Sequence, residues 1–307
     1  MSLSIPFVYH ASYSQLALPS THRFPTTKYH NLYQHALKQQ LLFEQYRHTP
    51  TPISKDTLYT VHCPQYVEQF INGALDHKAQ RRIGFPWSQE LVTRTLHAVN
   101  GTRLCAELAL EHGIAVHLTG GYHHAHYDFG SGFCIFNDLV IAARSAIDSG
   151  RADKVLIFDC DVHQGDGTAT LTQGNPDIIN CSIHCAQNFP SRKQQSDHDI
   201  ALDKGCTDKQ YLEHIQQILP YLIRIHQPDL IIYDAGVDIH QHDDLGYFAI
   251  SNQGILARDK QVILIAKMNG IPLAAVIGGG YSRSETELTI RHSQLLVAAN
   301  ELWASQY

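Results

Sequence analysis

The sequence lacks several features that mark whole classes of protein. No apolar run approaches the roughly 18 residues that a membrane-spanning helix needs. The first ten residues lack the basic start and apolar stretch of a secretory signal, so we expect a cytoplasmic protein. Basic residues are not in excess, since the formal net charge is -6, and this argues against direct nucleic-acid binding.

The cysteines lack the pattern of a disulfide framework. There are seven of them, an odd number, and no C-x-x-C occurs. We expect reduced thiols, several of them buried. Cys181 and Cys185 flank His184, but no second cysteine pair completes a tetrahedral thiolate site.

Histidine, by contrast, is abundant. The chain has 21 histidines against 23 lysines and arginines together. Imidazole titrates near neutral pH and binds metals, so this excess hints at metal or acid–base chemistry. A hydrophobic content of 44% is enough to build a core.

Short apolar runs alternate with helical patterns along the chain. The runs are Ile5–Tyr9, Ile114–Leu118, Lys154–Asp159, Ile178–Ile183, Leu230–Tyr233 and Pro272–Ile277. Helical periodicity occurs over Gln89–His112, Asp208–Ile225, Gln253–Met268 and Glu285–Trp303, and Phe189–Gly205 has the polarity of a long loop. This alternation predicts one α/β domain over residues 1–307, with a mostly parallel central sheet and helices on both faces.

Ligands of such sheets bind beyond the carboxyl ends of the strands, and polar clusters occur there. After the run that ends at Asp159, the residues Asp159, Asp161 and His163 alternate, so an extended chain points all three to one face. A turn explains the following Gly165-Asp166-Gly167 but not these aligned ligands. The pattern therefore favours a divalent metal.

Three more clusters follow other predicted strands. Gly120-Gly-Tyr-His-His-Ala125 joins two glycines to two adjacent histidines, and a glycine loop at 130–138 leads to a helix capped by Asn137 or Asp138. Asp238 is the best-placed carboxylate after the run at 230–233. Gly278-Gly-Gly-Tyr281 could present a phenol that donates to an oxyanion, although alone it reads as a turn before a helix.

Taken in order, these clusters resemble the zinc-dependent histone deacetylase family of the arginase–deacetylase superfamily. The matching segments are GGYHHA (120–125), GFCIFND (132–138), DCDVHQGDG (159–167), SIH (182–184), DAGVD…DDLG (234–246) and GGGY (278–281). Gln164 after His163, the segment CSIHCAQNFP at 181–190 and the short length resemble the class IV branch.

The resemblance implies a role for each matched residue. It implies zinc ligands Asp161, His163 and Asp238, tandem histidines His123 and His124 oriented by Asp159 and Asp166, and the transition-state tyrosine Tyr281. The acyl-lysine tunnel would be lined by Phe133, Phe189, Gly132 and Gly279. A structural potassium site would use Asp159, Asp161, His163, Ser182 and Ile183, mostly through backbone carbonyls.

Two positions depart from the family pattern. Segment 83–87 (IGFPW) has no acid where many members carry one that grips the substrate backbone. Asp244 stands where the family motif has proline, which changes loop stiffness rather than chemistry.

The resemblance implies hydrolysis of acyl groups, acetyl or longer, from lysine side chains of proteins or peptides. Acetylpolyamines or other small acylamides are alternative substrates, and an acyl-lysine binding module without activity is a further alternative. A two-manganese ureohydrolase would need D-A-H-x-D, but Gly165 stands two residues after His163.

Overall fold

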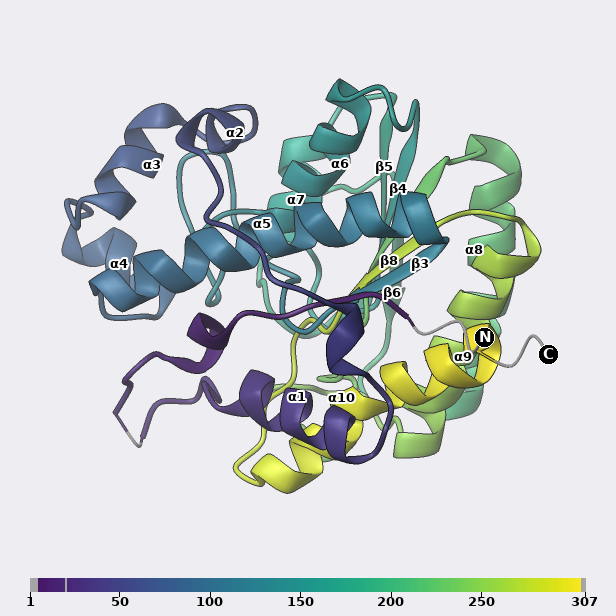
Figure 1. Ribbon diagram of the computed structural model, residues 1–307. Coiled ribbons are helices and arrows are strands. Elements are labelled where there is room, and N and C mark those ends of the chain that lie inside the picture. Colours follow the sequence, from purple (N-terminus) through teal and green to yellow (C-terminus); the bar gives the residue numbers. More distant parts are fainter. Residues whose placement is uncertain (1–4, 20, 305–307) are drawn as a thin grey trace.

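Eight parallel strands form the sheet at the centre of the fold (Figure 1). This computed structural model describes residues 5–19 and 21–304. The strands are β1 (Phe7–Val8), β2 (Arg47–His48), β3 (Ile114–His117), β4 (Val155–Asp159), β5 (Ile178–Cys185), β6 (His198–Leu202), β7 (Leu230–Asp234) and β8 (Leu273–Val276). Their order in space is β2-β1-β3-β8-β7-β4-β5-β6.

Helices cover both faces of this sheet, which is why β3, β4, β5, β7 and β8 are buried along their whole length. The helices are α1 (Lys28–Lys38), α2 (Lys55–Tyr59), α3 (Pro64–Ile71), α4 (His77–Ile83), α5 (Gln89–His112), α6 (Asp138–Asp148), α7 (Asp166–Thr172), α8 (Asp208–His226), α9 (Asn252–Met268) and α10 (Glu285–Ala299). In the described part of the chain, none of them combines the length and the apolar character needed to cross a bilayer.

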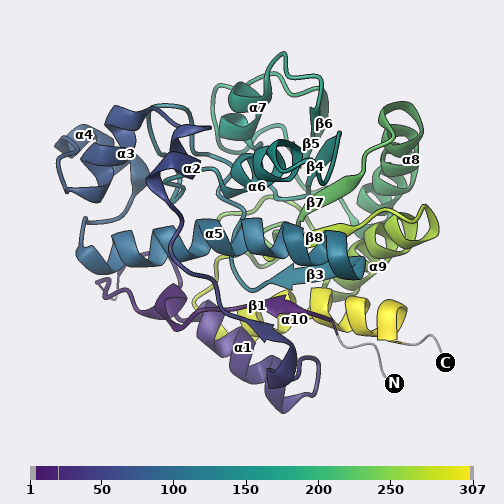
Figure 2. The ribbon, with the colours of Figure 1, turned by 45° about the horizontal axis from the view of Figure 1, so that its top comes forward.

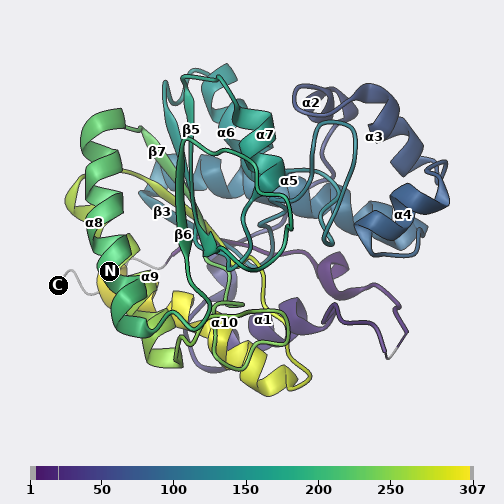
Figure 3. The same cartoon turned by 180° about the vertical axis from the view of Figure 1, so that it is seen from behind.

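The helices form two layers. Helices α5 and α6 pack against each other over β3, β8 and β4 (Figure 2). Helices α1, α10, α9 and α8 form a row in that order, each in contact with the next (Figure 1). Helices α2, α3 and α4 lie together at one end of the molecule, on the right in Figure 3. The fold is thus the predicted α/β architecture.

Most predicted elements are present, with shifted ends. All six predicted strands form, and α5 has the predicted bounds. The helix predicted over Glu285–Trp303 ends at Ala299 and continues as a π-helical turn, η3 (Asn300–Ala304). Asn137 caps α6, because its side chain accepts the N–H of Val140.

The prediction of a loop over Phe189–Gly205 was wrong in part. Strand β6 lies within this segment and pairs with β5 alone. Only alternate side chains of this edge strand face the core. The strand therefore lacks the continuous apolar run that marks the buried strands. The two-residue strand β2 at the opposite edge was missed for the same reason.

Buried neutral histidines make the stability of this fold sensitive to acid. His62 is fully buried, its Nδ1 donates to the carbonyl of His126 at 2.9 Å, and its Nε2 accepts the N–H of Asn137 at 2.9 Å. Burial lowers the pKa of His62 to about 4. In the unfolded chain the pKa of His62 is about 6.5. Between this pH and about pH 4, the unfolded state binds a proton on His62 and the folded state does not, so acid favours unfolding.

We therefore expect His62 to contribute about 2 kcal/mol to the loss of stability between pH 7.5 and pH 5. Urea unfolding at both pH values measures this loss. The variant His62→Gln, whose amide can still donate and accept, should lose less stability than the wild type over the same interval. An equal loss in both proteins would show that His62 is not responsible.

Candidate functional site

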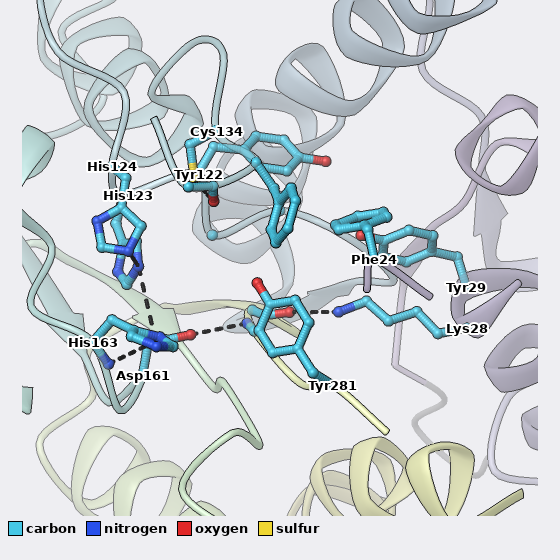
Figure 4. Close-up of a pocket in the computed structure, with 16 residues that line it drawn as sticks. Phe24, Lys28, Tyr29, Tyr122, His123, His124, Cys134, Asp161, His163 and Tyr281 are labelled. Carbon is cyan, nitrogen blue, oxygen red and sulfur yellow. Dashed lines mark hydrogen bonds and ion pairs between the residues drawn. The ribbon is translucent and has the colours of Figure 1, made fainter. Parts of the chain in front are cut away.

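The polar clusters predicted from the sequence converge at the carboxyl edge of the sheet. Strands β3, β8, β7 and β4 are neighbours at its centre, so the loops that follow them meet. Asp159 at the end of β4 pairs in register with Ser182 of β5 and Asp234 of β7. Figure 4 shows the pocket that these loops surround, with His123, His124, Asp161, His163 and Tyr281 on its wall.

Asp161, His163 and Asp238 form a compact group of metal-ligand type. The Nδ1 atom of His163 lies 3.0 Å from Oδ1 of Asp161 and 3.2 Å from Oδ2 of Asp238. Burial opposes charge on the imidazole, but the two carboxylates outweigh it and raise the pKa of His163 to about 10. Burial and the nearby Asp161 raise the pKa of Asp238 to about 6.

Three observations fit this group to a divalent cation. The Oδ2 atom of Asp238 is buried and, apart from the ion-pair contact with His163, has no hydrogen-bond partner among the described residues. One atom from each of the three side chains lies within 4.8 Å of the others. A Cβ atom on Gly279 would stand 2.3 Å from Oδ2 of both Asp161 and Asp238, so only glycine leaves this space open. Two carboxylates and one imidazole suit zinc with an open coordination position.

The tandem histidines each contact a carboxylate but differ in protonation state. His123 Nδ1 lies 2.7 Å from Oδ2 of Asp159, and His124 Nδ1 lies 2.6 Å from Oδ1 of Asp166. Burial opposes a charge on His123, but Asp159 and Asp161 outweigh it and raise its pKa well above the usual value. Burial and the charge on His123 lower the pKa of His124 to about 4.

The second histidine is therefore arranged as a base. Its Nδ1 donates to Asp166, which leaves Nε2 as an acceptor, 3.1 Å from Nε2 of His123. Both imidazoles border the pocket in Figure 4. A neutral imidazole beside a charged one provides a proton acceptor and a fixed positive charge in one cavity.

Tyr281 faces this pair across the pocket. Burial, then Asp161 and Asp238, raise the pKa of the Tyr281 phenol well above its usual value, so it keeps its proton and can donate it in a hydrogen bond. The backbone N–H of Tyr281 donates to Oδ2 of Asp243 at 2.7 Å, which fixes the loop.

Of the two predicted tunnel phenylalanines, Phe133 lines the pocket, and Phe189 lies beside it against His124. The Phe189 ring stands 4.8 Å from the His124 ring, edge to face, and the Phe133 ring lies 5.9 Å from the Tyr281 ring. Phe133 adopts a φ of 67°, and its N–H donates to the carbonyl of Ile83 at 2.8 Å. A Cβ on Gly132 would meet the His124 ring at 2.7 Å. The cavity of this pocket measures about 30 Å³.

Comparison with known proteins decides the family. The model of the histone deacetylase domain matches residues 22–296. The chain belongs to the histone deacetylase family.

Individual relatives agree with this assignment. An uncharacterized protein of Picosynechococcus sp. is 45% identical over 301 residues, covering 98% of this chain and all of that one. Histone deacetylase 2 of Arabidopsis thaliana is 28% identical over 303 residues, covering 92% and 76%. A probable deacetylase of Methanothermobacter thermautotrophicus is 30% identical over 197 residues, covering 60% and 58%. The crystal structure of the HDA15 HD domain shares the fold, with a TM-score of 0.79 at 18% identity over 98% of this chain and 90% of that one. Placement in the class IV branch stays a prediction.

Within this histone deacetylase fold, the geometry disfavours a two-metal ureohydrolase. A side chain at Gly165 would begin 2.6 Å from Oδ2 of Asp159, so the extra carboxylate of that motif has no room. His123, Asp159 and Asp234 do form a second compact group. However, Nδ1 of His123 is occupied by Asp159, and burial raises the pKa of Asp234 well above its usual value.

Other predicted residues lie where their strands put them. Ser182 and Ile183 are buried in β5 beside the end of β4, and a potassium ion there stays a prediction.

All seven cysteines are free. Among the described residues, the groups that could hold a metal do not include Cys181 or Cys185, and His184 instead contacts the Ser182 hydroxyl at 3.0 Å.

Two residues hold the loops of the site although the sequence did not predict this role for them. Lys28 is buried at the start of α1, and its Nζ donates to the carbonyls of Gly278 and Gly280 (Figure 4). Asp138, predicted only as a helix cap, accepts the N–H groups of Gly121 and Tyr122 just before the tandem histidines. No local sequence pattern indicates the role of Lys28. For Asp138, the pattern that could have indicated it is a carboxylate at the start of a helix directly after a glycine loop.

Proposed function

We propose that this histone deacetylase homologue is a zinc-dependent hydrolase that removes a short acyl group from lysine side chains of proteins or peptides. One observation carries the proposal. Asp161 and His163 of the metal-type group, the tandem histidines and Tyr281 all border one cavity of about 30 Å³, and Asp238 lies against Asp161 and His163. A space of this size holds about one or two water molecules, which supports an acetyl group rather than a long chain.

Asp161, His163 and Asp238 would hold the zinc ion. When bound, zinc polarises the acyl carbonyl and lowers the pKa of a water molecule. The Nε2 atom of His124 would take the proton of the attacking water and later give it to the leaving lysine amine. Asp166 orients that imidazole through the hydrogen bond to Nδ1.

His123 and Tyr281 would stabilise the charge that develops on the acyl oxygen. His123 supplies a positive charge held by Asp159, and Tyr281 donates its phenol proton in a hydrogen bond. Phe133 and Phe189 would flank the methylene chain of the substrate lysine, with Gly132 and Gly279 leaving room for it. We also propose that the protein is cytoplasmic and that it binds a structural potassium ion.

Replacing Tyr281 with phenylalanine is expected to lower kcat about a hundredfold. Loss of one oxyanion donor costs on the order of 3 kcal/mol of barrier, and each 1.4 kcal/mol is about tenfold in rate. Steady-state kinetics on an acetyl-lysine peptide measures the change, with zinc content as the control for an intact metal group. An unchanged kcat would refute the role of the phenol.

The assay that tests the proposed function compares substrate classes directly. The zinc-loaded protein is incubated with acetyl-, octanoyl- and myristoyl-lysine peptides and with acetylated polyamines. We expect turnover of the acetyl-lysine peptide to be fastest. Faster release from the polyamines would favour a small-acylamide hydrolase, and zinc binding without turnover of any substrate would favour a binding module.

A further inference from the structure

We propose that this protein prefers acyl-lysines flanked by acidic residues, because the mouth of its pocket carries an excess of unneutralised positive charge. This inference rests on the proposed function and concerns the part of the substrate that stays outside the cavity. It begins from segment 83–87 beside the tunnel wall, which contains no acidic residue.

Three segments around the mouth contain no acidic residue at all. Overall the chain has 29 aspartates and glutamates against 23 lysines and arginines. Segments 21–24, 77–87 and 189–195 nevertheless contain only basic charges, namely Arg23, Lys78, Arg81, Arg82, Arg192 and Lys193. The sign of the charge at these segments is thus opposite to that of the whole molecule.

Contacts with the tunnel walls place each of these segments at the mouth. In the first, the rings of His22 and Phe24 lie 5.7 and 5.3 Å from the ring of Phe133, with Arg23 between them in the chain. In the second, the carbonyls of Arg82 and Ile83 accept the N–H groups of Gly132 and Phe133. Helix α4 and the chain just before α1 lie on the same side of the molecule in Figures 1 and 3.

The third segment begins with Phe189 itself. The Nζ atom of Lys193 donates to the carbonyls of Asn188 and Pro190. The ammonium group of this lysine therefore already has hydrogen-bond partners within the segment. Arg192 is exposed. The mouth is therefore bordered by an exposed arginine on each of three separate segments.

These charges lack close ion-pair partners, although Asp76, which caps α4, is near enough to Lys78 and Arg82 for them to help lower its pKa. Across residues 5–19 and 21–304, none of Arg23, Lys78, Arg81, Arg82 and Arg192 forms an ion pair with a carboxylate within 4.0 Å. The guanidinium of Arg82 lies over the Phe129 ring at 4.5 Å.

Three exposed acids, Asp76, Asp128 and Asp244, adjoin these segments and offset only part of the charge. Unpaired exposed cations attract anionic partners, raise the association rate and repel cationic ones. A polyamine, which is cationic, would be disfavoured at this mouth, and so would a lysine-rich tail. A peptide with glutamate or aspartate beside the acyl-lysine fits the charge.

The test uses acetyl-lysine peptides that differ only in their flanks, with glutamate, glutamine or lysine at the two positions on each side. At low salt we expect kcat/KM for the glutamate peptide to exceed that for the glutamine peptide by about three- to tenfold, with the lysine peptide slowest. The difference should shrink at high salt, because charges are screened beyond about 10 Å already at 0.1 M.

Charge-removing variants assign the effect to the mouth. Arg23→Gln and Arg192→Gln should each reduce the glutamate-to-glutamine ratio. Arg151→Gln is the matched control, since Arg151 is equally exposed but precedes β4, at the opposite end of the strands. Equal rates for the glutamate and glutamine peptides, or a ratio that Arg151→Gln lowers as much, would overturn the proposal.

Binding separates this proposal from the proposed function. Fluorescence anisotropy with labelled glutamate and glutamine peptides needs no turnover. Tighter, salt-sensitive binding of the glutamate peptide would support the acidic preference even in a protein that hydrolyses nothing. Equal binding would overturn it even if acetyl-lysine is hydrolysed.

Discussion

Replacing Asp238 with asparagine is expected to abolish zinc binding and to lower turnover at least about a thousandfold. Oδ1 of Asp238 accepts the N–H of Val162 at 2.9 Å, so asparagine must keep its oxygen there and turn its amide nitrogen toward His163. An amide N–H cannot coordinate a cation, and one of two negative charges is lost. Metal-assisted polarisation supplies several kcal/mol, and each 1.4 kcal/mol is about tenfold in rate. Metal analysis after dialysis and kcat on an acetyl-lysine peptide measure both effects.

The metal-free stability of the same variant distinguishes loss of metal from loss of fold. Burial and the neighbouring Asp161 raise the pKa of Asp238 to about 6, which means that its negative charge is unfavourable in the folded protein without a cation. The metal-free variant should therefore be at least as stable at pH 8 as the metal-free wild type. Marked destabilisation would show that Asp238 serves mainly to hold the loop, and full zinc occupancy would refute its role as a ligand.

Replacing His124 with alanine is expected to lower kcat about a thousandfold while zinc content stays unchanged. The hydrogen bond from Nδ1 to Asp166 makes Nε2 the acceptor nitrogen, and burial with the nearby His123 charge lowers the pKa of His124 to about 4. General acid–base groups of this kind contribute about a hundred- to ten-thousandfold. Steady-state kinetics across several substrate concentrations separates the change in kcat from any change in KM.

His126 offers a matched control for this experiment. It lies two residues further along and its Nε2 stands 3.3 Å from Oδ2 of the same Asp166, but it does not line the cavity. His126→Ala should therefore reduce kcat by less than about tenfold. If His124→Ala keeps a tenth of the wild-type rate while His123→Ala loses far more, the proton acceptor is His123.

The fold could be predicted largely from the sequence because its central strands are buried on both faces. Continuous apolar runs such as Val155–Asp159 and Leu230–Asp234 carry that burial in their composition. Strand β6 was missed since an edge strand contacts the core on alternate residues only. The candidate site residues could also be predicted from the sequence. They follow directly after these buried strands, in short segments such as 159–163.

The sequence by itself determined the family and the parallel α/β sheet, and it predicted which residues at the strand ends act as ligands, base and phenol. Only the tertiary structure decided how they work together. It shows that Asp159 and Asp161 keep His123 charged while burial and the His123 charge keep His124 neutral, and that Lys28 and Asp138 hold the loops. It also brought Arg23, Arg82 and Arg192 around one pocket mouth. The physical reason is that pKa values and surface charge depend on distances between residues far apart in the chain, which no local pattern encodes.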